Sequence, residues 1–329
     1  MHDRTAWPEL DYGAWRDTGA SLHRWTQIVG KVRLALTPWL NHGWHVPLYV
    51  TARGLGTSAI HVDGGVVEIE FDLVEHRLVV RTSSAPARGF ALAPMAVAEF
   101  YRRVLGELAA AGVDVAIHPV PNEIAGAIPF PDDTVHAAYD RDVANACWRA
   151  MVQVDRVLRL FRTSFLGKAS PVHFFWGSFD LAVTRFSGRP APPHPGGVPG
   201  LPDAVTREAY SHEVSSAGFW PGSDAWPHAS LYSYAYPTPA GFDRAALEPE
   251  GAVWSESMGE WLLPYDLVRR ADDPDAFALR FLESTYRAAA DLGGWDRALD
   301  CAIGVPRRPR PVGGLVDNGR AQSKADPAR

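Results

Sequence analysis

The sequence predicts an α+β protein in which helices pack on one face of antiparallel sheets. A helix pattern, several short strand patterns and a second helix pattern follow one another, and this order occurs twice. Strands joined by short turns pair antiparallel. We therefore expect a first half over residues 1–134 and a second half over residues 135–304, packed as one unit, followed by a disordered tail over residues 305–329.

The first half begins with a predicted loop over residues 1–17, whose tryptophans should pack onto the core. A helix is predicted over residues 21–36, where apolar residues recur at helical spacing between Ser21 and Pro38. A second helix is expected over residues 94–111. Strands are predicted over residues 44–53, 66–72, 77–82 and 113–118.

The second half repeats this order with longer loops. Its helices are predicted over residues 141–166 and from Asp273 to about Gly294, and Asp273 before Pro274 is a typical helix start. Strands are expected over residues 207–216 and 231–236, and residues 168–189 form either one bent strand or a hairpin. Glu256 and Glu260, four residues apart, are expected on a solvated helix face.

An internal duplication is one interpretation of this repeated order. Residues 25–33 resemble residues 148–156, and residues 100–112 resemble residues 281–293. The second copy would carry inserted loops, including residues 189–202 and 242–266. Amphipathic helices also share such patterns by chance, so both interpretations stay open.

Composition and charge exclude several classes of function. The formal net charge is −6, and the tail is basic, so the remaining chain is more acidic than the total. An acidic body is a poor partner for phosphate backbones, so we expect no nucleic acid. No apolar run approaches the length of a membrane span, and the two cysteines form no motif. We expect a cytoplasmic protein with free thiols.

Familiar cofactor motifs fail at specific positions. Residues 54–59 match a dinucleotide glycine pattern, but no helix pattern follows to receive a pyrophosphate. Gly167-Lys168-Ala-Ser170 lacks the earlier glycine of a phosphate-binding loop. His42 and His45 would need metal ligands from elsewhere in the chain. The sequence thus predicts no metal and identifies no cofactor.

The stretch from Lys168 to Arg189 is the first place where polar groups interrupt a strand pattern. It mixes large aromatic residues with ionisable ones, and burying an ionisable group costs free energy unless it finds a partner. Asp180 lies between Phe179 and Leu181 and should be at least half buried. Gly177 is a candidate bulge that would exchange the two strand faces.

The second such stretch runs from Tyr210 to Gly222. His212 and Glu213 fall on opposite faces of a strand, so at most one of them can point into a shared cleft. Asp180 and Glu213 are a candidate carboxylate pair for acid–base chemistry. The structural alternative is a buried ion pair of Arg185 with Asp180 or Glu213 and no chemistry. Tyr232, Tyr234 and Tyr236 alternate along a strand and would line the same cleft or a plain core.

These considerations select two sets of candidate residues. The candidate catalytic residues are Asp180, Glu213 and His212. The candidate ligand-binding residues are Lys168, His173, Trp176, Ser178, Arg185, Arg189, Tyr210, Trp220 and Tyr232.

The two stretches also carry a resemblance to a known family. Ser170-Pro-Val-His-Phe-Phe-Trp-Gly-Ser-Phe-Asp-Leu181, Tyr210-Ser-His-Glu-Val-Ser-Ser-Ala-Gly-Phe-Trp-Pro-Gly222 and Trp25-Thr-Gln-Ile-Val-Gly-Lys31 resemble an uncharacterised bacterial domain of unknown function, DUF5996. The resemblance covers roughly Trp7 to Trp295. It implies no activity, cofactor or catalytic residue.

Two functions are consistent with the sequence. The first is a cytoplasmic small-ligand-binding protein, which would include an enzyme, with a cleft formed by residues 168–189 and 207–222. The second is a non-catalytic protein-interaction module that uses an aromatic surface, since aromatic residues concentrate at interfaces. The sequence leaves open which is correct, what the ligand is and how the chain oligomerises.

Overall fold

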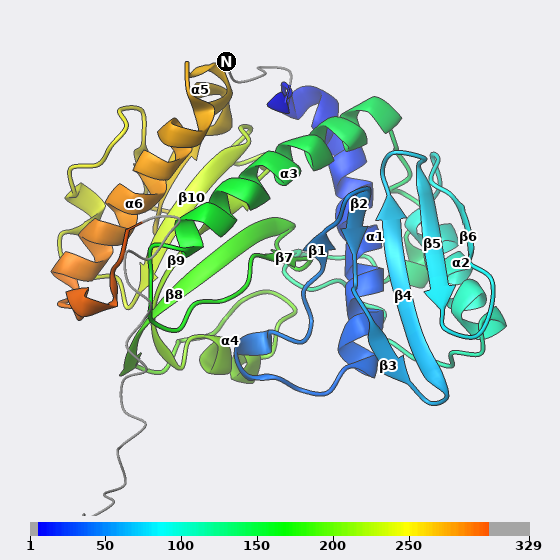
Figure 1. Ribbon diagram of the computed structural model, residues 1–329. Coiled ribbons are helices and arrows are strands. Elements are labelled where there is room, and N and C mark those ends of the chain that lie inside the picture. Colours follow the sequence, from blue (N-terminus) through cyan, green and yellow to red (C-terminus); the bar gives the residue numbers. More distant parts are fainter. Residues whose placement is uncertain (1–5, 303–329) are drawn as a thin grey trace, which may run out of the picture.

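The computed structural model describes residues 6–302 and has the predicted α+β architecture. Within this range the chain forms six α-helices and two antiparallel sheets (Figure 1). The predicted disordered tail over residues 305–329 lies outside the described residues.

The first sheet is built from the N-terminal half and is covered by two helices. Its strands are β1 Tyr49–Val50, β2 Gly54–Gly56, β3 Ile60–Val62, β4 Gly65–Asp72, β5 Arg77–Thr82 and β6 Arg88–Ala91. Its order is β1-β2-β4-β5-β6, with β3 also paired to β4. Helices α1 Tyr12–Leu36 and α2 Val97–Ala110 pack against it through a stack of Trp25, Phe100 and Phe71.

The second sheet is built from the C-terminal half. Its strands are β7 His173–Phe175, β8 Asp180–Pro190, β9 His212–Trp220, β10 Ser230–Tyr236, β11 Val253–Ser255 and β12 Glu260–Pro264, in the order β11-β12-β10-β9-β8-β7. Helices α3 Arg141–Arg162, α5 Tyr265–Arg270 and α6 Pro274–Leu292 cover one face. In Figure 1, α3 and α6 cross in front of β8, β9 and β10. The short helix α4 Asp203–Ala209 lies between β8 and β9 in the chain.

Helix α1 begins earlier than the sequence pattern predicts. Asp11 caps it by accepting a hydrogen bond from the Ala14 backbone, so residues 12–17 are helical and the predicted loop there is wrong. The apolar stripe starts at Leu22, and the first turns hold polar and small residues that pattern reasoning assigned to a loop. From Ser21 to Arg33 nearly every residue is buried, including polar ones.

Several strand predictions need correction. Residues 113–118 alternate like a strand but form none, since no sheet edge in the described chain pairs with them. Residues 44–53 contribute only the two residues of β1. Residues 207–216 end α4 and begin β9, because Pro202 and Asp203 start a helix first. Glu260 opens β12 and does not lie on a helix.

The remaining helix and strand predictions are confirmed, with small shifts of their ends. The hairpin alternative holds for residues 168–189, because β7 and β8 pair antiparallel with a turn at residues 176–179. Asp273 caps α6 through the Ala276 backbone, as its position before Pro274 predicts.

The two sheets meet at their edges in the middle of the molecule. Leu48 and Phe174 exchange backbone hydrogen bonds of 2.9 and 2.8 Å, which link the segment before β1 to β7. A continuous set of buried apolar side chains extends through both halves. The internal duplication is not confirmed, and the two sheets differ in strand order. The division at residues 134 and 135 stays a prediction.

Candidate functional site

The face of the second sheet that points away from α3 and α6 carries most of the polar candidates. Side chains alternate along a strand, and residues directly opposite one another share a face. The register β8–β9–β10–β12 therefore places a set of polar and aromatic residues on this side. We call it the tyrosine–carboxylate face; its members are Asp180, Thr184, Ser216, Trp220, Tyr232, Tyr234 and Glu260.

Asp180 lies at the start of β8, at one end of this face, and is 8% exposed. The Tyr232 hydroxyl donates a hydrogen bond to its carboxylate. Burial raises the pKa of Asp180 to about 7, against the opposing effect of the Tyr232 hydrogen bond and with help from the negative charge of Glu123. Near neutral pH this carboxyl group can therefore both hold and release a proton.

Two further carboxyl groups share this environment. Burial, and then the charge of Asp180, raise the pKa of Glu260 to about 8. Glu123 accepts a hydrogen bond of 2.6 Å from Ser178 Oγ, and burial raises its pKa. In the described part of the chain, no lysine or arginine contributes to the charge balance of Asp180, Glu123 or Glu260. The group is thus acidic and uncompensated.

Tyrosine hydroxyls surround the carboxyl groups. Tyr232 and Tyr234 stack with ring centroids 6.1 Å apart, and the hydroxyls of Tyr210 and Tyr234 lie 2.8 Å apart. A Cβ at Gly218 would meet the Tyr232 ring, so the absence of a side chain there lets Tyr232 lie across β9. Burial raises the pKa of Tyr232 and Tyr210 well above the ordinary value, so both stay protonated donors.

Helix α1 holds Glu123 in place through its buried polar residues. The Gln27 side chain accepts a hydrogen bond of 2.7 Å from the Asn122 backbone and donates one of 2.8 Å to the Asn122 carbonyl. Lys31 donates to the Asn122 side chain. A Cβ at Gly177 would overlap the Glu123 carboxylate, so this glycine is what admits Glu123 to the β7–β8 turn.

A second polar group lies at the other end of the same face. Lys168 Nζ is 2.7 Å from His42 Nε2, and His42 Nδ1 is 3.2 Å from the Ala209 carbonyl. These contacts place the His42 proton on Nδ1, with Nε2 as the acceptor from Lys168. The His212 ring lies 5.9 Å from the His42 ring. His212 is therefore separated from Asp180 by the length of β8 and β9.

His173 lies between these groups on β7 and is 1% exposed. Neither ring nitrogen has a hydrogen-bond partner among the described residues. Burial lowers its pKa to about 4, aided by the charge of Arg33. The rings of Trp44, Tyr49 and Phe175 surround it, so it is a neutral side chain inside an aromatic shell.

Arg185 points to the opposite, helix-covered face and is fully buried. Its guanidinium carbon lies 3.5 Å from the Phe161 ring centroid and 4.2 Å from that of Tyr286. It donates to the Phe161 carbonyl and to Ser164 Oγ, and it pairs with Glu283 at 3.5 Å. Arg185 therefore forms neither of the ion pairs with Asp180 or Glu213 that were the structural alternative.

Glu213 and Arg189 form a separate ion pair, which links β9 to the end of α6. Arg189 pairs with Glu213 at 2.7 Å and also donates to the carbonyls of Gly293 and Gly294 at the end of α6. Glu213 lies on the opposite face from Asp180 and at the other end of the strands. The structure thus does not bring the predicted Asp180–Glu213 pair together. A cavity of about 170 Å³ beside Glu213 is lined chiefly by apolar residues from β10, from the end of α6 and from the loops that follow them.

The remaining candidates are divided between these environments. Trp176 lies in the β7–β8 turn, donates to the Val46 carbonyl at 2.9 Å and packs on Gly30 of α1. Ser178 is exposed beside Glu123, and Trp220 is half-buried at the end of β9. Within residues 6–302, no cluster of three or more His, Cys, Asp or Glu side chains is arranged to hold a metal ion. None of the helices described is long and apolar enough to cross a membrane.

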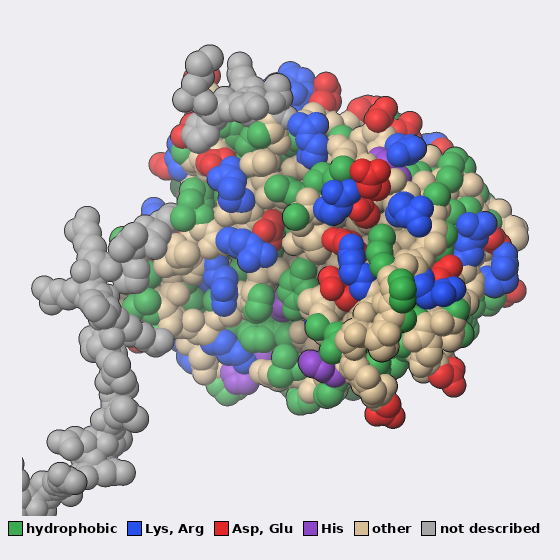
Figure 2. All heavy atoms as spheres, turned by 45° about the vertical axis from the view of Figure 1, so that its right-hand side comes forward, with side chains coloured by type: hydrophobic (Ala, Val, Ile, Leu, Met, Phe, Trp, Pro, Cys, Tyr) green, Lys and Arg blue, Asp and Glu red, His purple; other side chains and the backbone are tan. Residues whose placement is uncertain are grey.

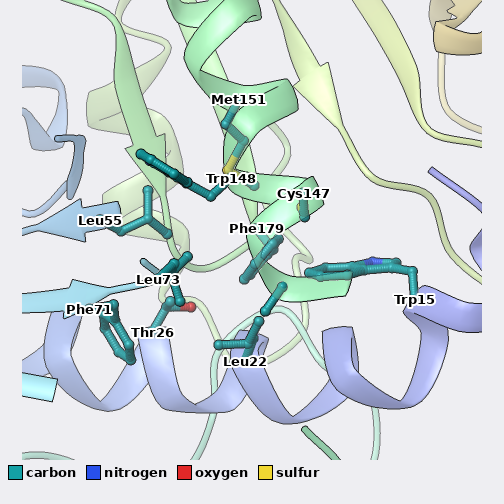
Figure 3. A pocket seen from close by; sticks show the side chains of 11 residues that line it. Trp15, Leu22, Thr26, Leu55, Phe71, Leu73, Cys147, Trp148, Met151 and Phe179 are labelled. Carbon is teal, nitrogen blue, oxygen red and sulfur yellow. The ribbon is translucent and has the colours of Figure 1, made fainter. Parts of the chain in front are cut away.

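A small gap in the core between the halves is not a ligand site. Apolar side chains of α1, α3 and the first sheet converge on it (Figure 3). Its volume is about 10 Å³, which is at most the space of one water molecule. Its walls offer too few polar partners to hold one.

A comparison with known families decides the membership of the chain. The model of a family of unknown function, DUF5996, matches residues 7–301. The chain belongs to this family. The match includes every residue of the tyrosine–carboxylate face, so this face lies within the part shared with DUF5996. No curated protein and no solved structure matches the chain.

Sequence reasoning missed two members of the acidic group. Glu123 lies in a proline-rich loop with no local pattern, and contacts with residues distant in the sequence, such as Gln27 with Asn122 and Ser178 with Glu123, position it. Glu260 was placed on a helix because it follows Glu256 by four residues. The short apolar run Trp261-Leu262-Leu263, ended by Pro264, is also the pattern of a buried strand.

Proposed function

We propose that the tyrosine–carboxylate face binds a small ligand that carries a positively charged nitrogen. The observation that supports this is the uncompensated acidic group: Asp180, Glu123 and Glu260 share one region, and no cation of the described chain balances them. A bound cation would supply the missing charge. The sequence predicts a small-ligand-binding cleft formed by residues 168–189 and 207–222, and this proposal adds the chemical class of the ligand.

The aromatic residues of the face favour an organic cation. Trp220, Trp226, Phe175 and Tyr234 are half-buried and pack around Tyr232. Aromatic rings attract ammonium and guanidinium groups through their negative faces. The described residues offer no metal-binding cluster, and an amine needs only one or two carboxylates and a ring.

Binding of such a cation should release protons. Asp180 and Glu260, with pKa values of about 7 and about 8, hold protons at pH 6, and a cation favours their ionised forms. The affinity should therefore rise as the pH increases from 6 to 8.5. The same pKa of Asp180 suits general acid–base catalysis, so an enzymatic role stays part of this proposal.

Titration calorimetry with agmatine, benzylamine and choline tests the proposal. We expect at least one of them to bind, with proton release that shows as a dependence on the buffer's ionisation enthalpy. Benzyl alcohol, which lacks the charge, should not bind. Asp180→Asn with Glu260→Gln should abolish the proton release.

Asp155→Asn is the matched control, because Asp155 is a buried carboxyl group on α3 with a raised pKa caused by burial. It should leave amine binding unchanged. Equal binding of benzyl alcohol and benzylamine, or no binding of any amine up to millimolar concentrations, contradicts the proposal.

The interaction-module function stays the alternative. Trp39 is 68% exposed and Leu40 beside it is 47% exposed, which is the kind of surface that contacts partners. Sedimentation of the wild type and of Trp39→Ser at high concentration measures whether this surface drives self-association.

We further propose that the protein is cytoplasmic. We also propose that it is bacterial, as the resemblance to a bacterial family leads us to expect. The free cysteines Cys147 and Cys301 support a reducing compartment. Basic and acidic side chains are interspersed over the face shown in Figure 2. This distribution supports the expectation that nucleic acid is not a partner.

A further inference from the structure

The cavity beside Glu213 lies where β9 begins and where β10 and α6 end. Its rim is open to solvent, and Leu292 on this rim is 49% exposed. Apolar cavities of about 150 Å³ are large enough to hold a benzene ring. The volume of about 170 Å³ therefore gives room for one aromatic ring.

Tyr236 forms one wall of this cavity and is held in place from outside it. Its ring lies 5.0 Å from the His194 ring and 5.4 Å from the Tyr210 ring, measured between centroids. Its hydroxyl donates to the Pro192 carbonyl at 3.0 Å. Because that donor is already used, Tyr236 contributes chiefly its ring to the cavity.

A turn at the end of α6 forms another wall. A Cβ at Gly293 would meet the Ala289 carbonyl at 2.8 Å and the Trp295 ring at 3.2 Å, so the absence of a side chain there lets Trp295 fold back on the helix. The Trp295 backbone donates to the Ala290 carbonyl at 2.8 Å, and its ring lies 6.0 Å from that of Tyr286. A wall fixed in this way loses little conformational freedom when a ligand binds.

Among the described residues that line the cavity, Glu213 is the charged one. Its Oε2 atom accepts hydrogen bonds from Ser187 Oγ at 2.8 Å and from Arg189 Nε and Nη2 at 2.9 and 2.7 Å. No group within residues 6–302 donates a hydrogen bond to Oε1. The protein thus anchors one carboxylate oxygen and leaves the other able to accept a hydrogen bond from a ligand.

The balance of charge at the cavity disfavours ionic ligands. Arg189 compensates Glu213, and the carbonyls of Gly293 and Gly294 hold the guanidinium at 2.6 and 2.9 Å. The guanidinium would repel a cation, and the carboxylate would repel an anion. A neutral molecule with one hydrogen-bond donor matches both the charge balance and the apolar walls.

We propose that this cavity binds a neutral aromatic molecule with one hydroxyl or N–H group, such as a phenol or an indole. Its ring contacts Tyr236 and Trp295, and its donor binds Glu213 Oε1. Water has few polar partners along the apolar walls, so the ring displaces it readily. A hydrogen bond to a carboxylate is stronger than one to a neutral acceptor. The site is independent of the proposed cation site, because Glu213 and Asp180 lie on opposite faces of the sheet.

Titration calorimetry of the full-length protein with phenol and toluene tests the hydrogen bond. The two molecules have nearly the same shape, and only phenol carries a donor. Toluene leaves water more readily because it has no hydroxyl group to desolvate, so a preference for phenol reports the hydrogen bond. We expect phenol to bind at millimolar concentrations or below, at least about fivefold more tightly than toluene.

Methyl NMR of protein with labelled alanine and leucine locates the binding. Phenol should shift the methyl signals of Ala289 and Leu292, which line the cavity. The signal of Ala182 should stay unchanged, because Ala182 belongs to the small apolar cluster around Tyr232 on the other face of the sheet.

Two variants separate the role of Glu213 from general effects of charge. Glu213→Gln keeps the size of the side chain and removes its charge, so it should weaken phenol binding about fivefold and leave toluene binding unchanged. Asp275→Asn is the matched control, because Asp275 is also paired with an arginine and its side chain is 18% exposed, against 19% for Glu213. It should leave the binding of both molecules unchanged.

Three results would overturn the proposal: no binding of phenol at millimolar concentrations, binding of phenol no tighter than that of toluene, or an unchanged phenol affinity in Glu213→Gln. If that variant does not fold, as judged by circular dichroism, the methyl spectra of the wild type decide the matter. Phenol-induced shifts that miss Ala289 and Leu292, or that extend to Ala182, then contradict the site.

Discussion

Asp180 and Arg185 lie five residues apart on β8 and satisfy their burial in different ways. Arg185 faces the helices and is surrounded by aromatic rings, with Glu283 as its ionic partner. Asp180 faces the other side with a tyrosine hydroxyl and no cation from the described chain. Strand alternation keeps the two apart, which is why a buried ion pair between them does not form.

Asp180 should make the protein less stable as the pH rises. Its pKa is about 7 in the folded state, above the ordinary value of 3.8. The folded state therefore binds more protons than the unfolded state between about pH 4 and pH 7, and stability falls as pH rises through that window. Asp180→Asn should remove this dependence and should be more stable than the wild type at pH 8 by roughly 1–4 kcal/mol.

Urea unfolding at a series of pH values measures this prediction. Asn can still accept the hydrogen bond from Tyr232, so the contact itself is kept. A variant that is several kcal/mol less stable than the wild type at every pH would indicate that Asp180 has a cationic partner after all.

Replacing Arg185, by contrast, should destabilise the protein. Arg185→Met leaves the Glu283 carboxylate without its cationic partner and removes one donor from the Phe161 carbonyl, and breaking a buried ionic network of this kind typically costs roughly 3–5 kcal/mol. Arg280→Met, at an exposed position of α6, should change stability by no more than about 0.5 kcal/mol. Equal effects of the two substitutions in chemical denaturation would contradict the structural role of Arg185.

At the scale of elements, the sequence predicts whether a segment forms a helix or a strand better than it predicts which other segment it pairs with. Hydrophobic periodicity and capping residues locate α2, α3, α6 and the β4–β5 and β7–β8 hairpins, because those signals are local. The start of α1 was missed because its first turns carry no apolar stripe. The strand predicted at residues 113–118 failed because pairing depends on a neighbouring edge that local alternation does not report.

The candidate site shows the same division. Asp180, Tyr210, Trp220, Tyr232 and Ser178 come together near the tyrosine–carboxylate face. Glu213, Arg189 and Arg185 do not, since one strand face and one strand end separate them from it. Contacts across long sequence distances, such as that between α1 and the loop carrying Glu123, leave no pattern in a single sequence.

Glycine substitutions in two helices test how tightly α1 is enclosed. A Cβ at Gly30 would overlap the Trp176 ring, while a Cβ at Gly106 of α2 meets nothing within 4 Å. Gly106→Ala should stabilise the protein by about 0.5–1 kcal/mol through helix propensity. Gly30→Ala should instead destabilise it by roughly 1–3 kcal/mol, because the buried ring must move.

Thermal denaturation of both variants provides the comparison. Because the two substitutions have the same intrinsic effect on a helix, the difference between them reports packing alone. Two variants that are equally stabilised would show that Trp176 is free to move away from α1.

At the scale of the whole molecule, the two sheets share one core. The buried apolar side chains of α1, α3 and both sheets are continuous, and the Leu48–Phe174 hydrogen bonds join the sheet edges. Halves that share a core in this way are expected to depend on one another for stability.

The protein should therefore unfold in one cooperative step. Calorimetry should give equal calorimetric and van't Hoff enthalpies, and a fragment of residues 1–134 should not fold by itself, because it exposes the faces of α1 that the β7–β8 turn and α3 cover. Two resolved transitions, or a folded fragment with native-like near-ultraviolet dichroism, would show that the halves are independent domains.

The enclosure of α1 between Ser21 and Arg33 has a consequence for biosynthesis. Gly30 packs on Trp176 and His23 binds the Gly177 carbonyl, so partners of this early helix are made about 150 residues after it. At ordinary elongation rates of about 5–20 residues per second, the helix waits roughly 7–30 seconds at the ribosome before those partners exist. During that interval the side of α1 that packs on Trp176 has no native cover, which makes the nascent first half a natural client for chaperones that bind exposed helices.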